Sequence, residues 1–498
     1  IMANGMGSLM VGATGLRSSQ TALNTTAHNL SNVNTEGYTR QQITFADSTY
    51  ANVFSKSLNK GKYGLGVDID AISRIRNEFI DRSYRTESSR LGFYESQANA
   101  VYEVEDWFGE MQGVTYQQHI TNLYNAVNEL TKNPTSTIAR SSLIQNATAF
   151  IDRSEAIYSG LKDYQVTLNT EVNNMVEKIN SLGQKIYNLN KGIVKVEAEG
   201  VERANDLRDS RDLALDELSK YIDIDYYETK DGEVIVSAEN VPFITKNDIA
   251  KMSVREEGTY GLLIPQWEGY QQDVYNFDKQ ANNANDTDKG KLKGLLIARG
   301  VIEVNYTDIP VMPERADYDL TTEQGMAEYN SAMDAYQQKQ DYYNKYIEPS
   351  AILSAIAGFD KLVNGIVTAM NDVLCPETTM DTTKELTDAD GNILKAEKYV
   401  YNASTHDVLY DSHGNVVAGK ENGDGTYSYE ASEKLYVDAN QEETENIDSM
   451  TYKILDMSKA GYGMDDDETR GVELFKRNGT DRYKQITGAD GSTIYVRN

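Results

Sequence analysis

The chain has 498 residues, 39% of them hydrophobic, and its 77 acidic side chains against 48 basic ones give a formal charge of −29. The length suits about three domains, and the modest hydrophobic share favours thin or elongated domains over one thick core. So acidic a surface repels phosphate backbones and argues against nucleic acid as a partner. The single cysteine, Cys375, excludes an intrachain disulfide.

Neither a membrane span nor a cleaved leader is expected. No apolar run approaches the ~18 residues that cross a bilayer, so we expect no membrane insertion. The first residues, "IMANGMGSLMVGATG", lack both a cationic start and an unbroken apolar core, and they do not resemble a secretory signal. If the protein works outside the cell, it must leave by another route.

The first expected element is a helix over residues 8–31. Its seam residues recur at alternating spacings of four and three, as in the a and d positions of three heptads. These residues are Leu9, Ala13, Leu16, Gln20, Leu23, Ala27 and Leu30. So narrow a stripe predicts a partner helix, with packing on its own domain as the alternative. Residues 45–72 are polar and glycine-bearing, and we expect them to form an extended linker.

A series of helices is expected next. One runs from near Ile72 to about Phe108, and a shorter one covers 115–132. The longest extends from about Ser136 to Val196, and its ~60 residues make a rod on the order of 90 Å. A further helix, "ERANDLRDSRDLALDELSKYI", follows it. The seam expected to face inward in the first of these helices comprises Leu91, Tyr94, Ala98, Val101, Glu105 and Phe108.

Strand signals then alternate with helix signals. Four turns after Pro376, "DADGN", "DSHGN", "NGDGT" and "GADGS", have the composition of hairpin turns. The expected fold is α+β: an elongated, mainly α-helical, coiled-coil-like bundle rod with two β-rich inserted or outer domains. Its expected parts are an N-terminal assembly helix and turn (1–44), the extended linker (45–72), a long helical bundle (73–224), a β-rich domain (225–320), returning helices (321–375) and an outer β-rich domain (376–498).

The sequence offers no positive sign of catalysis. The histidines at 28, 119, 406 and 413 stand apart from one another and from Cys375, so they form no zinc ligand set. There is no P-loop, no G-x-S-x-G elbow and no dinucleotide-binding fingerprint. The acidic turns at 388–391 and 465–468 do not complete a calcium loop. We therefore expect no enzyme activity, no catalytic residue, no cofactor and no bound metal.

Two stretches carry a family resemblance. The heptad helix followed by "NLSNVNTEGY" at 29–38 resembles the N-terminal signature of flagellar axial proteins. The next residues, Thr39-Arg40-Gln41-Gln42, resemble the FlgK family of hook-associated proteins, whereas hook and rod subunits usually carry a lysine soon after the aromatic residue. "ANDL" at 204–207, continued by "RDLALDELS" at 211–219, resembles that family's helical domain. The similarity spans residues 8–221 and continues more faintly through 295–375.

This resemblance implies a structural subunit of the bacterial flagellum that joins hook to filament. It implies an extracellular protein, exported by the type III route without a cleaved signal. The implied partners are the hook protein, hook-associated protein 3, other copies of the chain in a ring, and a flagellar export chaperone. Family members end in a second heptad helix that pairs with the first. Because this chain ends in the hairpin-like "GADGSTIYVRN", we expect that the family's C-terminal helices are missing.

Function is expected to lie in the N-terminal helix and its turn. The predicted assembly interface consists of Leu9, Leu16, Leu23, Leu30, Asn32, Asn34, Gly37, Tyr38 and Arg40. In an isolated monomer we expect this segment to fray, and to become ordered when neighbouring helices bury its leucines. Two alternatives remain open: another axial protein, such as a hook or distal rod subunit, or an adhesin or enzyme domain carried on the outer inserts.

Overall fold

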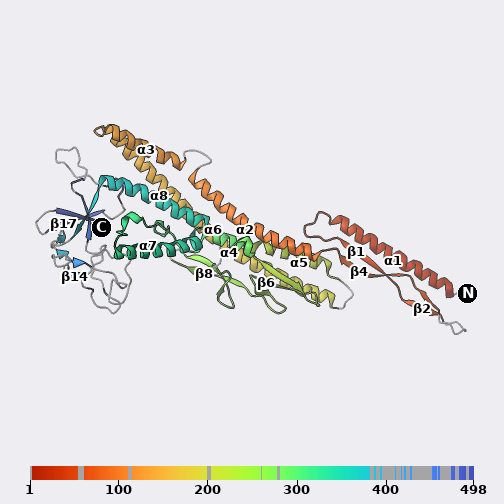
Figure 1. Ribbon diagram of the computed structural model, residues 1–498. Helices are drawn as coiled ribbons and strands as arrows, with labels where there is room; N and C mark the ends of the chain where they lie inside the picture. Colours follow the sequence, from red (N-terminus) through yellow and green to blue (C-terminus); the bar gives the residue numbers. More distant parts are fainter. Residues whose placement is uncertain are drawn as a thin grey trace. The chain divides into compact units, whose positions relative to one another are not determined.

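The computed structural model divides into two compact units, Ile1–Asp360 and Lys361–Asn498. It describes residues 3–53, 61–109, 115–198, 203–258, 261–277 and 281–381, and then the segments 386–388, 393–394, 410, 417, 420–421, 427–428, 451–456, 458–459, 473–476, 482–488 and 493–497. Within these residues, eight α-helices hold most of the regular structure, and the strands form small sheets (Figure 1). The mainly helical α+β class is therefore confirmed.

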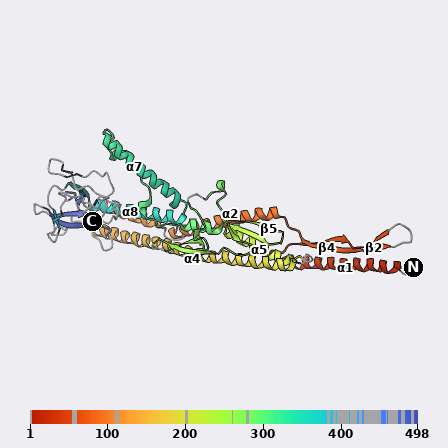
Figure 2. The ribbon, with the colours of Figure 1, turned by 90° about the horizontal axis from the view of Figure 1, so that it is seen from below.

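The N-terminal helix packs beside a hairpin. The elements are α1 (Ala3–Ser31), β1 (Gln41–Asp47), β2 (Tyr50–Val53), β3 (Gly61–Gly64) and β4 (Val67–Arg74). Strand β1 pairs antiparallel with β4, from Gln41↔Arg74 to Asp47↔Val67, and β2 pairs with β3. The segment expected as an extended linker is thus extended but paired, because pairing satisfies backbone groups that an open linker would leave to water. In both views α1 lies along this hairpin (Figures 1 and 2).

The second helix starts later than expected and buries a different face. Helix α2 (Glu78–Phe108) begins after Asn77, whose side chain accepts the N–H groups of residues 79 and 80, so Ile72 belongs to β4. The expected inward residues Leu91, Tyr94 and Val101 are exposed. The buried residues of α2 are instead mostly small, namely Arg85, Ser88, Ser89, Gly92, Phe93, Ser96 and Ala100.

Close approach of backbones explains this change of face. Helix α2 packs on α6 (Lys291–Arg299) and on α5 (Asn205–Tyr221). A Cβ on Gly92 would lie 2.5 Å from the carbonyl oxygen of Lys220, and one on Gly294 would lie 2.5 Å from that of Phe93. Small side chains therefore let α2 and its neighbours come together where its larger heptad residues could not fit.

The long helix agrees with the sequence prediction. Helix α4 (Thr137–Glu197) is unbroken, is capped by the Ser136 side chain, and follows α3 (Tyr116–Lys132). In both views α5 lies along it (Figures 1 and 2). Val196 at its end is exposed, but most of its apolar residues at heptad spacing are buried, together with Ser154: Leu143, Ala147, Phe150, Ile157, Leu161, Leu168, Met175, Ile179, Leu182, Ile186 and Ile193.

Two three-stranded antiparallel sheets pack on α4. The first contains β5 (Ile224–Glu228), β6 (Val234–Ala238) and β7 (Val241–Ile244); the second contains β8 (Met252–Glu257), β9 (Leu262–Trp267) and β10 (Gln272–Asp273). Asparagines of α4 hold both sheets. Asn180 donates to the carbonyl oxygen of Met252 and accepts its N–H at 2.8 and 2.9 Å. Asn190 makes the same pair of bonds to Val234 at 2.8 and 3.1 Å. Helix α6 and short 3₁₀ turns occupy the remainder of the expected β-rich domain.

Two further helices follow, and the boundary between the two units falls within the second of them. They are α7 (Glu323–Tyr342), which continues into a π-turn (Tyr343–Ile347), and α8 (Ala351–Leu374). By length and composition α8 could cross a membrane, which the sequence analysis did not anticipate. Ile352, Leu353 and Ile356 near its start are fully buried, whereas Leu362, Val373 and Leu374 farther along are exposed.

The second unit contains a six-stranded sheet in the order β11-β16-β18-β17-β12-β13. Its strands are β11 (Glu377–Asp381), β12 (Leu386–Asp388), β13 (Ile393–Leu394), β16 (Thr451–Leu455), β17 (Tyr483–Gly488) and β18 (Thr493–Arg497), and a separate pair is formed by β14 (Lys420–Glu421) and β15 (Tyr427–Ser428). These strands lie in the segment after Pro376 for which the sequence predicts a β-rich domain. The four hairpin turns predicted there lie almost wholly outside the described residues.

Candidate assembly site

Helix α1 has two faces of opposite character. One face is small and hydroxyl-bearing, and it packs on the hairpin, where Ser18 and Thr25 are buried. The Thr14 hydroxyl donates to the carbonyl oxygen of Leu65 at 3.3 Å, and the Ser18 hydroxyl donates to that of Val67 at 3.2 Å. The hairpin therefore holds α1 in place. The fraying of the N-terminal helix and its turn in an isolated monomer stays a prediction.

The opposite face carries the predicted leucines, and all four are exposed. Leu9, Leu16, Leu23 and Leu30 expose 72%, 76%, 65% and 73% of their surface. Arg17 is the only Lys, Arg, Asp or Glu in α1. A row of apolar side chains at heptad spacing, with almost no charge beside it, is the surface that another helix buries in a coiled coil.

Asn29 closes the turn after α1. Its Oδ1 atom accepts the N–H of Gln41 at 2.9 Å and the hydroxyl of Tyr38 at 2.7 Å, while its Nδ2 donates to the carbonyl oxygen of Gln41 at 2.9 Å. Burial, together with the carboxylates of Asp209 and Asp206, raises the pKa of Tyr38, so its hydroxyl stays protonated. Asn29 lies within the 29–38 motif but is not among the predicted site residues, because its role depends on how the turn closes.

The turn lies against α5. Gly37 has a φ of 79°, and a Cβ there would come within 3.1 Å of the Leu213 side chain. The N–H of Thr39 donates to Asp209 Oδ2 at 3.1 Å, and Gln41 Nε2 donates to Asp206 Oδ1 at 3.4 Å. The two stretches that carried the family resemblance, 29–42 and 204–219, therefore contact each other.

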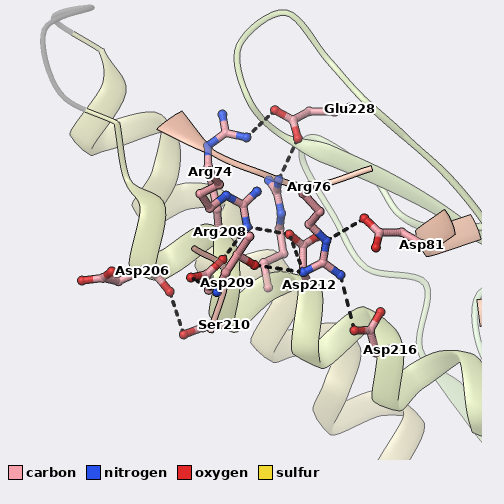
Figure 3. A network of polar contacts seen from close by, with 12 residues as sticks. Arg74, Arg76, Asp81, Asp206, Arg208, Asp209, Ser210, Asp212, Asp216 and Glu228 are labelled. Atoms are coloured by element: carbon pink, nitrogen blue, oxygen red, sulfur yellow. Dashed lines mark hydrogen bonds and ion pairs between the residues drawn. The ribbon is translucent and has the colours of Figure 1, made fainter. Parts of the chain in front are cut away.

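A network of charged side chains lies beside this contact (Figure 3). Asp209 and Asp212 lie on one face of α5, and Arg74 Nη1 at the end of β4 is 2.8 and 2.7 Å from their carboxylates. Burial alone would raise the pKa of Asp212, but the guanidinium groups of Arg76 and Arg74 outweigh it and hold that pKa below its usual value. Asp212 is therefore ionised at neutral pH.

Two further arginines extend the network along α5. Arg85 Nε of α2 lies 2.7 Å from Asp216 Oδ1, and Arg76 Nη2 lies 3.5 Å from Asp216 Oδ2. Arg76 Nε also lies 2.6 Å from Asp81 Oδ2. We use the name joint for the residues that connect the turn, the end of β4 and α2 to α5: Thr39, Arg74, Arg76, Arg85, Asp209, Asp212 and Asp216.

Some of the other predicted site residues make contacts within the turn, and others face solvent. Asn32 Nδ2 donates to the carbonyl oxygen of His28 at 3.0 Å, and the Thr35 hydroxyl donates to Asn32 Oδ1 at 3.2 Å. Asn34 and Arg40 are exposed, and the Arg40 guanidinium pairs with no residue that the structure describes. The structure thus brings Asn32, Gly37 and Tyr38 into contacts within the chain and leaves the leucines, Asn34 and Arg40 facing solvent.

The described residues offer little for other chemistry. They contain no group of three or more His, Cys, Asp or Glu side chains placed to hold a metal ion. Cys375 is buried. His406, His413 and the acidic turn at 465–468 lie outside the described residues.

Two protein-family models match parts of this sequence. The model of the flagellar hook-associated protein FlgK helical domain matches residues 101–332, and the model of the flagella basal body rod protein matches residues 9–39. The chain is 30% identical over 310 residues to flagellar hook-associated protein 1 of Bacillus subtilis strain 168, covering 60% of this chain and 61% of that protein.

More distant relatives have the same description. Flagellar hook-associated protein 1 of Salmonella typhimurium is 26% identical over 213 residues, which cover 42% of this chain and 37% of that protein. The Escherichia coli K12 protein is 26% identical over 219 residues, covering 42% and 38%. A solved structure of the flagellar hook junction protein FlgK from Burkholderia pseudomallei aligns with a TM-score of 0.36 and 19% identity, over 44% of this chain and 38% of that one. The matched region thus spans less than two thirds of the length of each relative.

Proposed function

We propose that the chain is a member of the FlgK family of flagellar hook-associated proteins and a structural subunit of the bacterial flagellum that joins hook to filament. The model of the FlgK helical domain matches residues 101–332, whereas the rod-protein model matches only residues 9–39. This difference favours the proposed role over that of a hook or distal rod subunit. The names of the relatives describe structural proteins, which supports a role without catalysis.

The exposed leucine row of α1 is the observation that carries the proposal. The hydroxyl face of α1 is occupied by its own hairpin, so the leucine face is available to another helix. Full burial of each leucine contributes about 1.5–3 kcal/mol. Four such residues would contribute about 6–12 kcal/mol, which is of the same order as the cost of bringing two helices together.

The proposed partners follow the family. The leucine face would pack on helices of the hook protein, of hook-associated protein 3 and of neighbouring copies in a ring, with the helical core toward the axis and the β-rich parts outward. Asn34 and Arg40 would contact adjacent subunits beside the leucines. An export chaperone would cover the same face before secretion by the type III route, and the assembled protein would be extracellular.

Charges placed in the leucine row test the proposal. In a bacterium that makes the full-length protein, Leu16→Asp and Leu23→Asp together should abolish filament growth on the hook, because each carboxylate would be buried without a partner. The protein itself should still be secreted, and filament subunits should be shed into the medium. Filaments are counted by electron microscopy, and both proteins are measured in the medium by immunoblot.

The matched control moves the same two charges to the flanks of the row. Ser19→Asp and Asn24→Asp occupy exposed positions beside the seam, where coiled coils tolerate charge. This control should keep most of its filaments. Normal filaments on the Leu16→Asp, Leu23→Asp variant would refute the role assigned to α1.

A further inference from the structure

We infer that the joint fixes the direction of the arm, defined as residues 3–74, relative to α5, and that Asp209 and Arg74 are its main positioning residues. The inference goes beyond the proposed function and relies on it only for what the arm binds. It assigns to these side chains the task of presenting the leucine row of α1 in one direction before any partner arrives.

The arm meets the rest of its unit at two places. One is covalent: β4 ends at Arg74 and α2 begins at Glu78, so three residues connect them. A short single connection leaves the arm able to swivel about its backbone dihedral angles. The other place is α5, which the turn after α1 contacts through Gly37 and Thr39. Asn205 Nδ2 of α5 also donates to the carbonyl oxygen of Ile72 in β4 at 2.9 Å. A second attachment at a separate point removes the freedom to swivel.

Asp209 ties the two places together. Its Oδ2 accepts the N–H of Thr39, and its Oδ1 pairs with Arg74 Nη1 at 2.8 Å. Gln41 and Arg74 are register partners at the open end of the β1–β4 ladder, so one carboxylate holds both strands of the hairpin where they reach α5. Asp212 shares the same guanidinium nitrogen at 2.7 Å.

The charges of the joint are shielded and balanced. The side chains of Arg74, Asp209 and Asp212 expose 13%, 8% and 12% of their surface. Removing one member of such a group leaves a buried charge without its partner, which is far more costly than losing a surface ion pair. The geometry of the joint is therefore narrowly defined, whereas a surface pair would tolerate many arrangements.

Helix α5 is itself held in place by ion pairs to its neighbours. Arg208 of α5 binds Glu197 at the end of α4 through two nitrogens, each 2.8 Å from a carboxylate oxygen. Arg208 also lies 2.6 Å from Glu228 of β5. The hydrogen bonds from Arg208 lower the pKa of Glu197 to about 2, against the effect of its burial, so this pair stays charged across the physiological range. The joint thus connects the arm to an element already fixed to α4 and β5.

Distance measurements in solution test the inference. Spin labels are attached to cysteines at Ser19 in α1 and Lys185 in α4, two exposed positions, in a chain that carries Cys375→Ser. The parent protein should give one narrow distance peak. Asp209→Asn and Arg74→Gln, separately and together, should lose that peak and give a broad distribution, while the helical melting curve of the chain stays cooperative.

Two controls separate positioning from stability. Arg74→Lys keeps the charge and should restore most of the narrow peak. Asp231→Asn removes an exposed ion pair with Lys246 outside the joint and should leave the peak unchanged. Arg74→Gln leaves every side chain of α5 intact, so it remains informative if Asp209→Asn does not fold. A peak as narrow as that of the parent in Arg74→Gln would overturn the inference.

The inference and the proposed function fail in different ways. If Leu16→Asp and Leu23→Asp leave filaments intact but Arg74→Gln broadens the distances, the joint stands and the assembly role falls. If the leucine variant blocks filaments while Arg74→Gln keeps the narrow peak, the assembly role stands and the joint falls.

Discussion

Asn180 of α4 uses its side-chain amide as a neighbouring strand would use a peptide group. A primary amide carries a donor and an acceptor in one plane, so it can satisfy both the N–H and the C=O of a single residue at a sheet edge. Asn180 does this for Met252, Asn190 for Val234 and Asn29 for Gln41. These asparagines attach extended segments to helices through hydrogen bonds to the backbone.

Replacing Asn180 should therefore loosen the second sheet. Asn180→Leu leaves the N–H and C=O of Met252 without partners, which should lower the free energy of unfolding by about 1–3 kcal/mol. The measurement is urea unfolding followed by circular dichroism. Asn188→Leu, at an exposed position of the same helix, is the control and should cost less. Equal midpoints for the two variants would show that the bonds to Met252 contribute nothing.

A buried carboxyl should make stability depend on pH. Burial raises the pKa of Glu239 from 4.5 to about 7; Asp223 adds to this effect, and Lys293 and Lys289 oppose it. Glu239 Oε1 is buried with no hydrogen-bond partner. Because the pKa is raised on folding, the group favours the folded state fully below pH 4.5, and this contribution is lost as the pH rises through about 7.

Glu239→Gln should remove that dependence. The parent should lose up to about 3 kcal/mol of unfolding free energy from this group across the window, whereas the glutamine variant should lose less. Unfolding by urea at a series of pH values measures the difference. Glu268→Gln, at an exposed position, is the control and should follow the parent. A Glu239→Gln variant with the same pH profile as the parent would contradict the assignment.

Three helices carry heptad seams, and they differ in the face that they bury. Helix α4 buries its seam, α1 presents its seam to solvent, and α2 buries serines and glycines while its own seam is exposed. The spacing of apolar residues predicts that a helix forms and roughly where it ends, and caps such as Ser136 refine the boundary. The spacing does not reveal which face finds a partner, because small residues at Gly92 and Ser18 permit approaches that leucines prevent.

A pair of matched substitutions checks this contrast. Ile179 is fully buried in the seam of α4, whereas Leu91 in the seam of α2 is 68% exposed. Ile179→Asp should cost several kcal/mol, because it buries a charge without a partner. Leu91→Asp should change the stability by less than about 0.5 kcal/mol. Thermal unfolding, followed by the helical signal, measures both. A large loss for Leu91→Asp would show that the α2 seam is covered in solution.

At the scale of the whole molecule, the charge is unevenly divided. Residues 1–53 contain two basic side chains, Arg17 and Arg40, and two acidic ones, Glu36 and Asp47, so their formal charge is zero. The whole charge of −29 therefore belongs to residues 54–498. Two copies repel through these acidic parts but not through the neutral segment that holds α1. Contact between copies is thereby directed toward the leucine row.

The contact between the two family signatures could not be predicted from either one. Thr39 and Asp209 are 170 positions apart, and nothing in "GYTRQ" or "ANDLRD" indicates that a backbone N–H of one meets a carboxylate of the other. The sequence did identify the leucine row, because heptad spacing is local information. The joint depends on how β4 and α5 are brought together, which local spacing does not contain.

Because its leucine row is exposed, the stability of α1 depends on the concentration of the partner that binds this row. A partner that binds only the ordered helix stabilises it by an amount that grows with the logarithm of the partner concentration. The melting of α1 should then shift with protein concentration, whereas the melting of α4, whose seam is covered within the chain, should not. Dilution should therefore lower the melting temperature of α1 and leave that of α4 unchanged, although the hairpin holds α1 in place in both cases.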